Sequence, residues 1–251
     1  SEFANSHHEE IKNQKESVTQ TLKDYYQNEE GHTYLIAIDP YFYLRQAENI
    51  IENGHVGDEI KENRPFDNHM LAPNGKYVNP SLHPYLIAFF YKISSVFGNK
   101  SIMSSAFILP LILICLAIIP CFFITKRFAG NVGATFASSI LAIHPSLLMR
   151  TPAGFSDTDA YNILFPLTIL WLILESFRTK KTKNKLIYSG LAGLCTGLYS
   201  IAWAGWWSSF DFIIAGLLVY FIVLLFRYKK EIYTKRLPKK FIHNSSIYLL
   251  S

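Results

Sequence analysis

Five apolar runs in the second part of the chain limit what it can fold into. They occupy residues 102–124, 132–149, 160–177, 186–203 and 210–226. A helix needs roughly 20 apolar residues to cross a bilayer, and each run approaches that length. Prolines at positions 110, 120 and 166 lie inside the runs, which membrane helices tolerate because neighbouring groups satisfy the freed backbone. The pattern predicts an all-α, polytopic membrane protein with about five spans.

Charge is distributed unevenly along the chain. Residues 1–80 carry a net charge of −7, and residues 81–251 carry +12. Half of the 251 residues are apolar, which is too many for a disordered chain. The Lys and Arg residues cluster between apolar runs, which is typical of a membrane protein, so we expect membrane lipids and no nucleic acid as partners.

The basic clusters predict the orientation of the spans. Lys126-Arg127, residues 178–185 and residues 227–240 all fall on one side of the predicted membrane domain, and by the positive-inside rule that side is cytoplasmic. Residues 1–100, the connection 150–159 and the connection 204–209 would then share the outer face. The protein is expected in the cell membrane, with its active face outside the cytoplasm.

Two domains are expected. Residues 1–100 form a mostly helical extracytoplasmic loop, with a solvated helix in 1–30, an ordered segment in 53–81 and an interfacial helix in 86–97. Residues 101–251 form a partial transmembrane domain. The chain begins without Met and ends inside an apolar stretch, so we expect a piece of a larger protein.

The connection between the second and third runs is unusually charged. It reads Arg150-Thr-Pro-Ala-Gly-Phe-Ser-Asp157-Thr-Asp159, and charges beside a bilayer are costly unless they have a partner or a function. One interpretation is that Asp157 and Asp159 cap the next helix and complement its positive end. The alternative is a binding site for a cation.

A second acid precedes a proline near the start of the outer loop. Asp39 follows the apolar stretch 34–38, and Pro40 suits the first position of a helix that would run to about Gly54. Asp39 is thus predicted to be an N-cap. The predicted topology nevertheless puts Asp39 and Asp157 on the same face. Converging carboxylates favour a hard divalent cation, and a nearby Arg150 suits a phosphate.

These motifs resemble the catalytic subunit of oligosaccharyltransferase in its archaeal form. Ile38-Asp39-Pro-Tyr-Phe-Tyr-Leu-Arg45 is similar to the family's first external-loop motif, and Arg150–Asp159 is similar to its second. Further similarities are Gly54-His-Val-Gly-Asp58-Glu, Met70-Leu-Ala-Pro73 and Leu82-His83-Pro84-Tyr85. The resemblance covers about residues 34–240 and includes the topology.

The resemblance implies a metal-dependent GT-C glycosyltransferase. It would move a dolichyl-phosphate- or diphosphate-linked oligosaccharide onto the side-chain amide of Asn in an acceptor protein carrying Asn-x-Ser/Thr. Asp39 and Asp157 would bind Mn²⁺ or Mg²⁺, and Asp39 would also contact the acceptor amide. Asp159 would be a third ligand or a support, and Arg150 would hold the donor's phosphates. Three tryptophans would line the outer rim, or form an interfacial aromatic belt: Trp203, Trp206 and Trp207.

Several family features are absent from residues 1–251. The first transmembrane helix, the later loop that supplies a glutamate to the metal site and the W-W-D-Y-G acceptor motif are missing. Trp206-Trp207-Ser-Ser-Phe-Asp211 is only a superficial likeness to that motif. The piece alone is therefore predicted to be inactive.

Three other functions fit parts of the pattern. An O-mannosyltransferase or lipid-sugar transferase also has acids in the first external loop, but the second acidic motif with its upstream Arg150 disfavours it. A cation transporter or channel would need polar residues along its spans, and the predicted spans contain few. A structural subunit would use all of the acids as caps.

Overall fold

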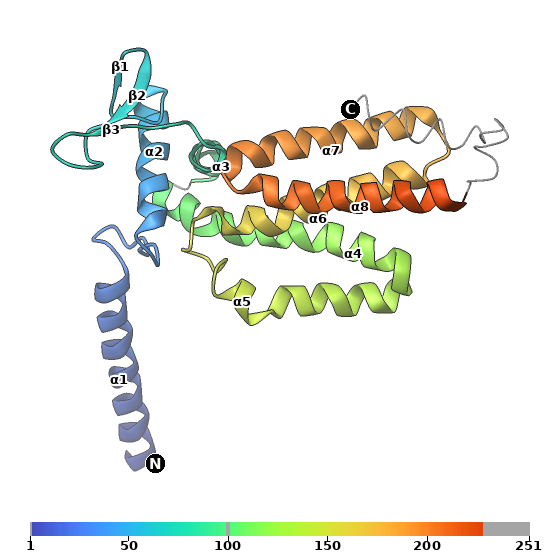
Figure 1. The fold of residues 1–251 in the computed structure, drawn as a ribbon. Helices are drawn as coiled ribbons and strands as arrows, with labels where there is room; N and C mark the ends of the chain where they lie inside the picture. Colours follow the sequence, from blue (N-terminus) through green and yellow to red (C-terminus); the bar gives the residue numbers. More distant parts are fainter. Residues whose placement is uncertain (1, 99–100, 228–251) are drawn as a thin grey trace. The chain divides into compact units, whose positions relative to one another are not determined.

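The computed structural model describes residues 2–98 and 101–227. These residues form two compact units. The first unit contains residues 1–77, 84–109 and 153–156, and the second contains residues 78–83, 110–152 and 157–251. The chain is mostly helical (Figure 1), which confirms the predicted class at that level.

The first unit combines helices with a small sheet. Helix α1 covers Glu2–Tyr26, as expected for the polar start of the chain. Helix α2 covers Asp39–Asn53 and ends at Gly54, whose φ of 80° provides the left-handed residue that terminates many helices. Helix α3 covers Leu82–Val96 and so begins four residues before the predicted start of the interfacial helix.

The expectation of an all-α chain is wrong in residues 59–77. Three short antiparallel strands lie in the order β1 (Glu59–Lys61), β2 (Arg64–Asp67) and β3 (Lys76–Tyr77). Glu62 and Asn63 join β1 to β2 with φ values of 48° and 64°, the positive values that a tight two-residue hairpin requires. The predicted ordered loop is thus a sheet that folds against α2 through side-chain contacts.

Helix α4 contains two predicted spans. It covers Ile102–Ile143 with non-helical dihedral angles at Gly130 (φ 67°, ψ −170°), and Figure 1 shows the chain turning back at the far end of α4. The second arm ends at Ile143 rather than at Met149, because His144 precedes Pro145 and takes an extended conformation (ψ 123°). The four-residue helix α5, Pro145–Leu148, follows.

The remaining helices form a packed group in the second unit. The 3₁₀ turn η1 (Thr158–Ala160) leads into α6 (Tyr161–Arg178), followed by α7 (Thr182–Ala202) and α8 (Trp206–Arg227). Helices α6, α7 and α8 run alongside one another in Figure 1. Between α4, α5 and α6 a core forms from Ile114, Ala117, Leu147, Leu141, Ile163, Leu164 and Leu167.

Three helical segments of the described residues are long and apolar enough to cross a membrane. They are Ile102–Ile143, Thr158–Arg178 and Trp206–Arg227. None of the residues of α8 is buried, and its large apolar side chains face outward, as a lipid-facing helix requires. Helix α7 is not among the three, because glycines, hydroxyl residues and three polar residues in its first turn reduce its apolar character.

Candidate functional site

The charged connection 150–159 begins as a continuation of α5. The backbone N–H groups of Arg150 and Thr151 donate to the carbonyl of Leu147 at 3.0 and 2.9 Å. The hydroxyl of the buried Thr151 donates to the same carbonyl at 2.7 Å. These bonds fix the backbone that carries Arg150, while its side chain remains 68% exposed.

Gly154 fixes the middle of the connection within the first unit. Its N–H donates to the carbonyl of Phe107 at 2.7 Å, and its carbonyl accepts from the N–H of Ile36 at 3.0 Å. Gly154 has a φ of 93°, and an added Cβ would lie 2.7 Å from the Phe107 ring and 2.9 Å from the Ile36 side chain. Only glycine therefore fits without displacing these neighbours.

Asp157 caps the start of the third predicted span. Its backbone is extended, and Oδ1 accepts from the N–H of Thr158 at 2.6 Å and from the Thr158 hydroxyl at 3.3 Å. The cap interpretation is thus confirmed for Asp157. Both bonds use Oδ1, so the second carboxylate oxygen points to a role beyond the cap.

Arg150 and Asp159 face each other across the connection. Nη1 of Arg150 lies 3.8 Å from Oδ2 of Asp159, and the Asp159 side chain is 34% exposed. Both residues line an open depression of about 470 Å³ in the second unit. Its other lining residues are Leu141, His144, Ser146, Leu147, Thr151, Asn162 and Ile163. The arrangement offers a cation and a carboxylate to a polar ligand beside an apolar wall.

A buried aromatic chain anchors the helix that carries these acids. Tyr161 is fully buried, and its hydroxyl lies 2.8 Å from Nδ1 of the fully buried His83. The Tyr161 ring stacks on Phe165, which stacks on Tyr199 of α7. The Tyr199 hydroxyl donates to Oδ1 of Asn162 at 2.9 Å. The prediction that His83 is a packed histidine rather than a ligand is consistent with this contact.

Asp39 does not cap α2 as predicted. The residue before it, Ile38, occupies the N-cap position with helical dihedral angles, and no side chain makes a cap hydrogen bond there. Asp39 is the first residue of the helix and is exposed, with Pro40 buried behind it. The prediction is wrong because the chain enters the helix one residue earlier. Asp39 complements the positive helix end by charge alone.

The four site residues predicted from the sequence belong to different units. Asp39 lies in the first unit, whereas Arg150, Asp157 and Asp159 lie in the second. Within the second unit the structure brings Arg150 and Asp159 together. The sharing of one ion by Asp39 and Asp157 stays a prediction.

A second acidic cluster surrounds Arg45 in the first unit, and sequence reasoning did not single it out. Asp58, Asp67 and His69 offer ligand atoms within 4.8 Å of one another. Arg45 lies among them, with Nη1 3.3 Å from Asp58 and 2.6 Å from Nδ1 of His69, and Nη2 bonded to Asp67. The guanidinium already neutralises the acids, so we interpret the cluster as a brace between α2 and the sheet.

Hydrogen bonds control the charge of Asp58. Burial alone would raise its pKa, but donors outweigh burial and lower the pKa to about 2. The donors are the backbone N–H of Asn68, the amide of Asn49 and the imidazole of His69, assisted by the charge of Arg45. The same balance lowers the pKa of Asp67, where burial is outweighed by Arg45 and by the N–H groups of Met70 and His69. The signal in the sequence was the pairing of Arg45 with two acids near glycine and proline turns.

The tryptophans after α7 split into packed and exposed groups. The Trp203 ring stacks with Tyr199, and Trp206 lies 5.5 Å from the Phe210 ring. The Trp207 side chain is exposed. Trp207 suits an interfacial belt, whereas Trp203 belongs to the aromatic chain that anchors α6.

Comparison with known proteins assigns the chain to a family. Residues 11–250 match the family model for "Oligosaccharyl transferase STT3, N-terminal". A dolichyl-phosphooligosaccharide-protein glycotransferase of Methanococcus voltae is 36% identical over 207 residues, which are 79% of this chain and 23% of that protein. The glycotransferase of the same name from Methanocaldococcus jannaschii is 35% identical over 221 residues, 82% of this chain and 24% of that protein.

Solved structures give the same assignment. The archaeal oligosaccharyltransferase AglB of Archaeoglobus fulgidus, solved with an inhibitory peptide and a dolichol-phosphate, is 25% identical with a TM-score of 0.60. The match covers 77% of this chain and 22% of that one. The same enzyme solved with Zn and sulfate has the same identity and TM-score, and 24% of it is covered. The chain spans about a quarter of the length of these relatives, and it belongs to the STT3 family of oligosaccharyltransferase subunits.

Proposed function

We propose that the full-length protein transfers a lipid-linked oligosaccharide to the side-chain amide of Asn in Asn-x-Ser/Thr acceptors. Membership of the family supports this proposal, as do the names of the archaeal relatives, which are dolichyl-phosphooligosaccharide-protein glycotransferases. The donor lipid would be a dolichyl phosphate or diphosphate. The same membership disfavours a transporter and an O-mannosyltransferase.

One contact carries the proposal for the site. The hydrogen bond between Ile36 and Gly154 joins the segments that lead to the two candidate ligands. Asp39 follows Ile36 by three residues, and Asp157 follows Gly154 by three residues. This tether supports a shared site for two acids that are 118 positions apart in the sequence.

The residues fit a divalent metal ion. Carboxylate oxygens are the ligands that Mg²⁺ and Mn²⁺ prefer. Asp39 is exposed and its carboxylate is not spent on a cap, and Asp157 uses one oxygen for Thr158. Asp39 and Asp157 would hold Mn²⁺ or Mg²⁺, and Asp39 would also contact the acceptor amide. When bound, the metal would offset negative charge that develops on the leaving phosphate.

Arg150 and Asp159 would serve the donor. An exposed guanidinium can bind a phosphate through two hydrogen bonds. Asp159 faces Arg150 at 3.8 Å, which favours the supporting role for Asp159 over the role of a third metal ligand. The depression between them would then bind the donor's phosphate, with its apolar wall toward the lipid.

The membrane arrangement completes the proposal. Residues 1–100 and the connection 150–159 would lie on the extracytoplasmic face, and residues 101–251 would form the GT-C-type membrane domain. The two arms of α4, with α6, α7 and α8, would supply five spans. Helix α7 packs against α6 through stacked rings and a 3.0 Å hydroxyl contact between Ser176 and Ser189, so neighbouring helices would shield its less apolar surface from lipid.

A transfer assay tests the function. Full-length protein is incubated with a lipid-linked oligosaccharide, Mn²⁺ and an Asn-x-Thr peptide, and glycopeptide is measured by mass spectrometry. Asp39→Ala and Asp157→Ala should each lower transfer at least a hundredfold, whereas Asp24→Ala at an exposed acid of α1 should not. Residues 1–251 alone should be inactive. Undiminished transfer by either site variant would refute the assignment.

A further inference from the structure

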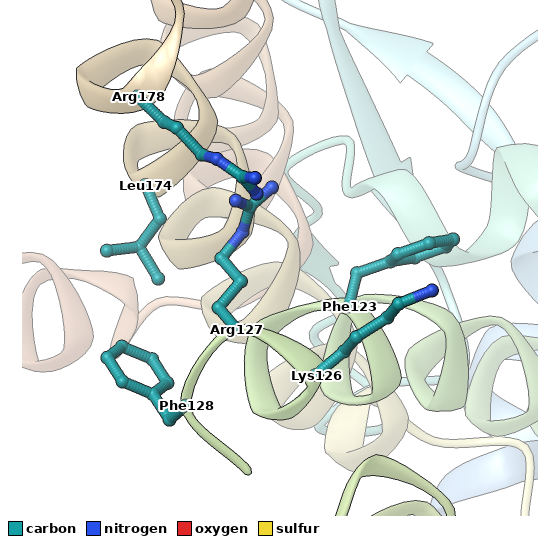
Figure 2. Close-up of a pocket in the computed structure, with 6 residues that line it drawn as sticks. All are labelled: Phe123, Lys126, Arg127, Phe128, Leu174 and Arg178. Carbon is teal, nitrogen blue, oxygen red and sulfur yellow. The ribbon is translucent and has the colours of Figure 1, made fainter. Parts of the chain in front are cut away.

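A basic pocket lies at the opposite end of α6 from the candidate site. Its lining residues come from α4 and from the last turns of α6 (Figure 2), and its volume is about 500 Å³. They are Phe123, Lys126, Arg127, Phe128, Leu174 and Arg178. None of them lines the depression beside Arg150 and Asp159, so the pocket is a separate feature of the second unit.

Two guanidinium groups face each other in this pocket. Figure 2 shows the side chains of Arg127 and Arg178 pointing tip to tip from different helices. Two like charges at close range repel each other. An anion bound between them would turn that repulsion into two attractive contacts, and phosphate oxygens match the guanidinium geometry.

Arg127 has donors that the protein does not satisfy. Its Nη2 pairs with Glu175, whose Oε1 also accepts from the indole N–H of Trp171 at 3.2 Å. Nε and Nη1 of Arg127 are buried and have no hydrogen-bond partner among the described residues. Buried donors without acceptors cost free energy, so these two nitrogens point to an absent acceptor.

The pocket also has apolar walls. Phe123, Phe128 and Leu174 line it, and the Phe128 side chain is 78% exposed. Exposed rings beside paired guanidiniums suit an amphiphile that carries an acyl chain and an anionic head. Basic pockets between transmembrane helices on the cytoplasmic side are known to bind anionic lipid headgroups. Lys126-Arg127 and Arg178 belong to the connections that the positive-inside rule puts on that side.

We propose that this pocket binds the phosphate of an anionic membrane phospholipid, with its acyl chain against Phe128 and Leu174. The lipid would hold the ends of α4 and α6 together at the membrane edge remote from glycan transfer. The proposal does not rest on the transfer activity, because it concerns different residues and a different ligand.

Native mass spectrometry of the full-length protein in detergent tests the proposal. Phosphatidylglycerol and phosphatidylcholine are titrated separately, and retained lipid is counted. Wild-type protein should retain phosphatidylglycerol at least fivefold more tightly than phosphatidylcholine, and Arg178→Gln should weaken phosphatidylglycerol binding about fivefold. Lys180→Gln is the matched control, because it removes the same charge from an exposed position outside the pocket, and it should leave the affinity unchanged.

Further arms separate the alternatives. Arg127→Gln combined with Glu175→Gln removes the buried pair together and should also weaken phosphatidylglycerol binding without leaving Glu175 unpaired. Equal affinity in wild type and Arg178→Gln would overturn the proposal. So would equal losses in Arg178→Gln and Lys180→Gln, which would show a diffuse charge effect. Inorganic phosphate alone should not displace the lipid, and full displacement would contradict a lipid site.

Discussion

Asp157 combines two tasks that substitution can separate. Its Oδ1 caps η1 through Thr158, and we propose that the carboxylate also binds a metal ion. Asn caps a helix as well as Asp does but lacks the charge that a divalent cation needs. The two substitutions at this position therefore distinguish the structural role from the catalytic one.

We expect Asp157→Asn in the full-length protein to keep its thermal stability and lose transfer. Asp157→Ala should lose both, with a destabilisation of about 1 kcal/mol from the missing cap. Thermal melts and the peptide transfer assay measure the two effects. Wild-type transfer by Asp157→Asn would show that the residue is only a cap.

Asp58 gives the first unit a dependence on acid. Its pKa falls from 3.8 to about 2 on folding, so its contribution to stability is fully present above pH 3.8 and disappears as the pH falls toward 2. The contribution is about 1–2 kcal/mol after screening by water. In Asp58→Asn, this part of the stability loss between pH 5 and pH 2.5 should be absent.

Melting of the full-length protein across this pH range measures the effect. Glu29→Gln, at an exposed acid of the same unit, is the control and should keep the wild-type profile. A variant Asp58→Asn with the wild-type profile would mean that Arg45 and the other donors do not hold this carboxylate ionised.

At the level of elements, apolar runs and helix breakers predicted the helices well. The ends of α2 at Pro40 and Gly54 could be predicted, because proline and glycine act locally. The sheet could not be predicted, because β1 and β2 are short and mostly charged and lack the alternation that marks a strand. Their hairpin turns at Glu62-Asn63, which is not a strong turn sequence.

The site was predicted in part for the same reason. Local chemistry revealed Arg150, Asp157 and Asp159, which lie within ten residues of one another. The brace around Arg45 depends on contacts between residues up to 24 positions apart, and no local pattern marks such contacts. The cap at Asp39 was wrong because the entry to α2 depends on the preceding backbone rather than on the side chain.

Gly130 permits the turn in α4. Its φ of 67° and ψ of −170° lie in a region that is essentially restricted to glycine. Gly130→Ala should destabilise the full-length protein by about 1–3 kcal/mol. Gly190→Ala is the control, because Gly190 is helical with open space around its Cα, and it should be neutral or slightly stabilising.

Thermal melting in detergent compares these two glycine variants. An equal effect of both substitutions would contradict a required turn at Gly130 and would favour a single uninterrupted helix.

At the scale of the whole molecule, the proposal depends on α7 crossing the membrane. Connections before and after α7 must then lie on opposite sides. Lys180→Cys and Ala204→Cys, each in a background without Cys115, Cys121 and Cys195, should react with an impermeant thiol reagent from opposite faces of sealed vesicles. The cytoplasmic face should label position 180. Labelling of both positions from one face would contradict five spans.

The central claim is that two acids 118 positions apart bind one metal ion. Electron paramagnetic resonance of Mn²⁺ titrated into the full-length protein measures this directly. We expect one bound ion per wild-type chain, with the affinity falling at least tenfold in both Asp39→Asn and Asp157→Asn and staying unchanged in Asp58→Asn. Wild-type affinity in either Asp39→Asn or Asp157→Asn, or a loss in Asp58→Asn alone, would contradict the account.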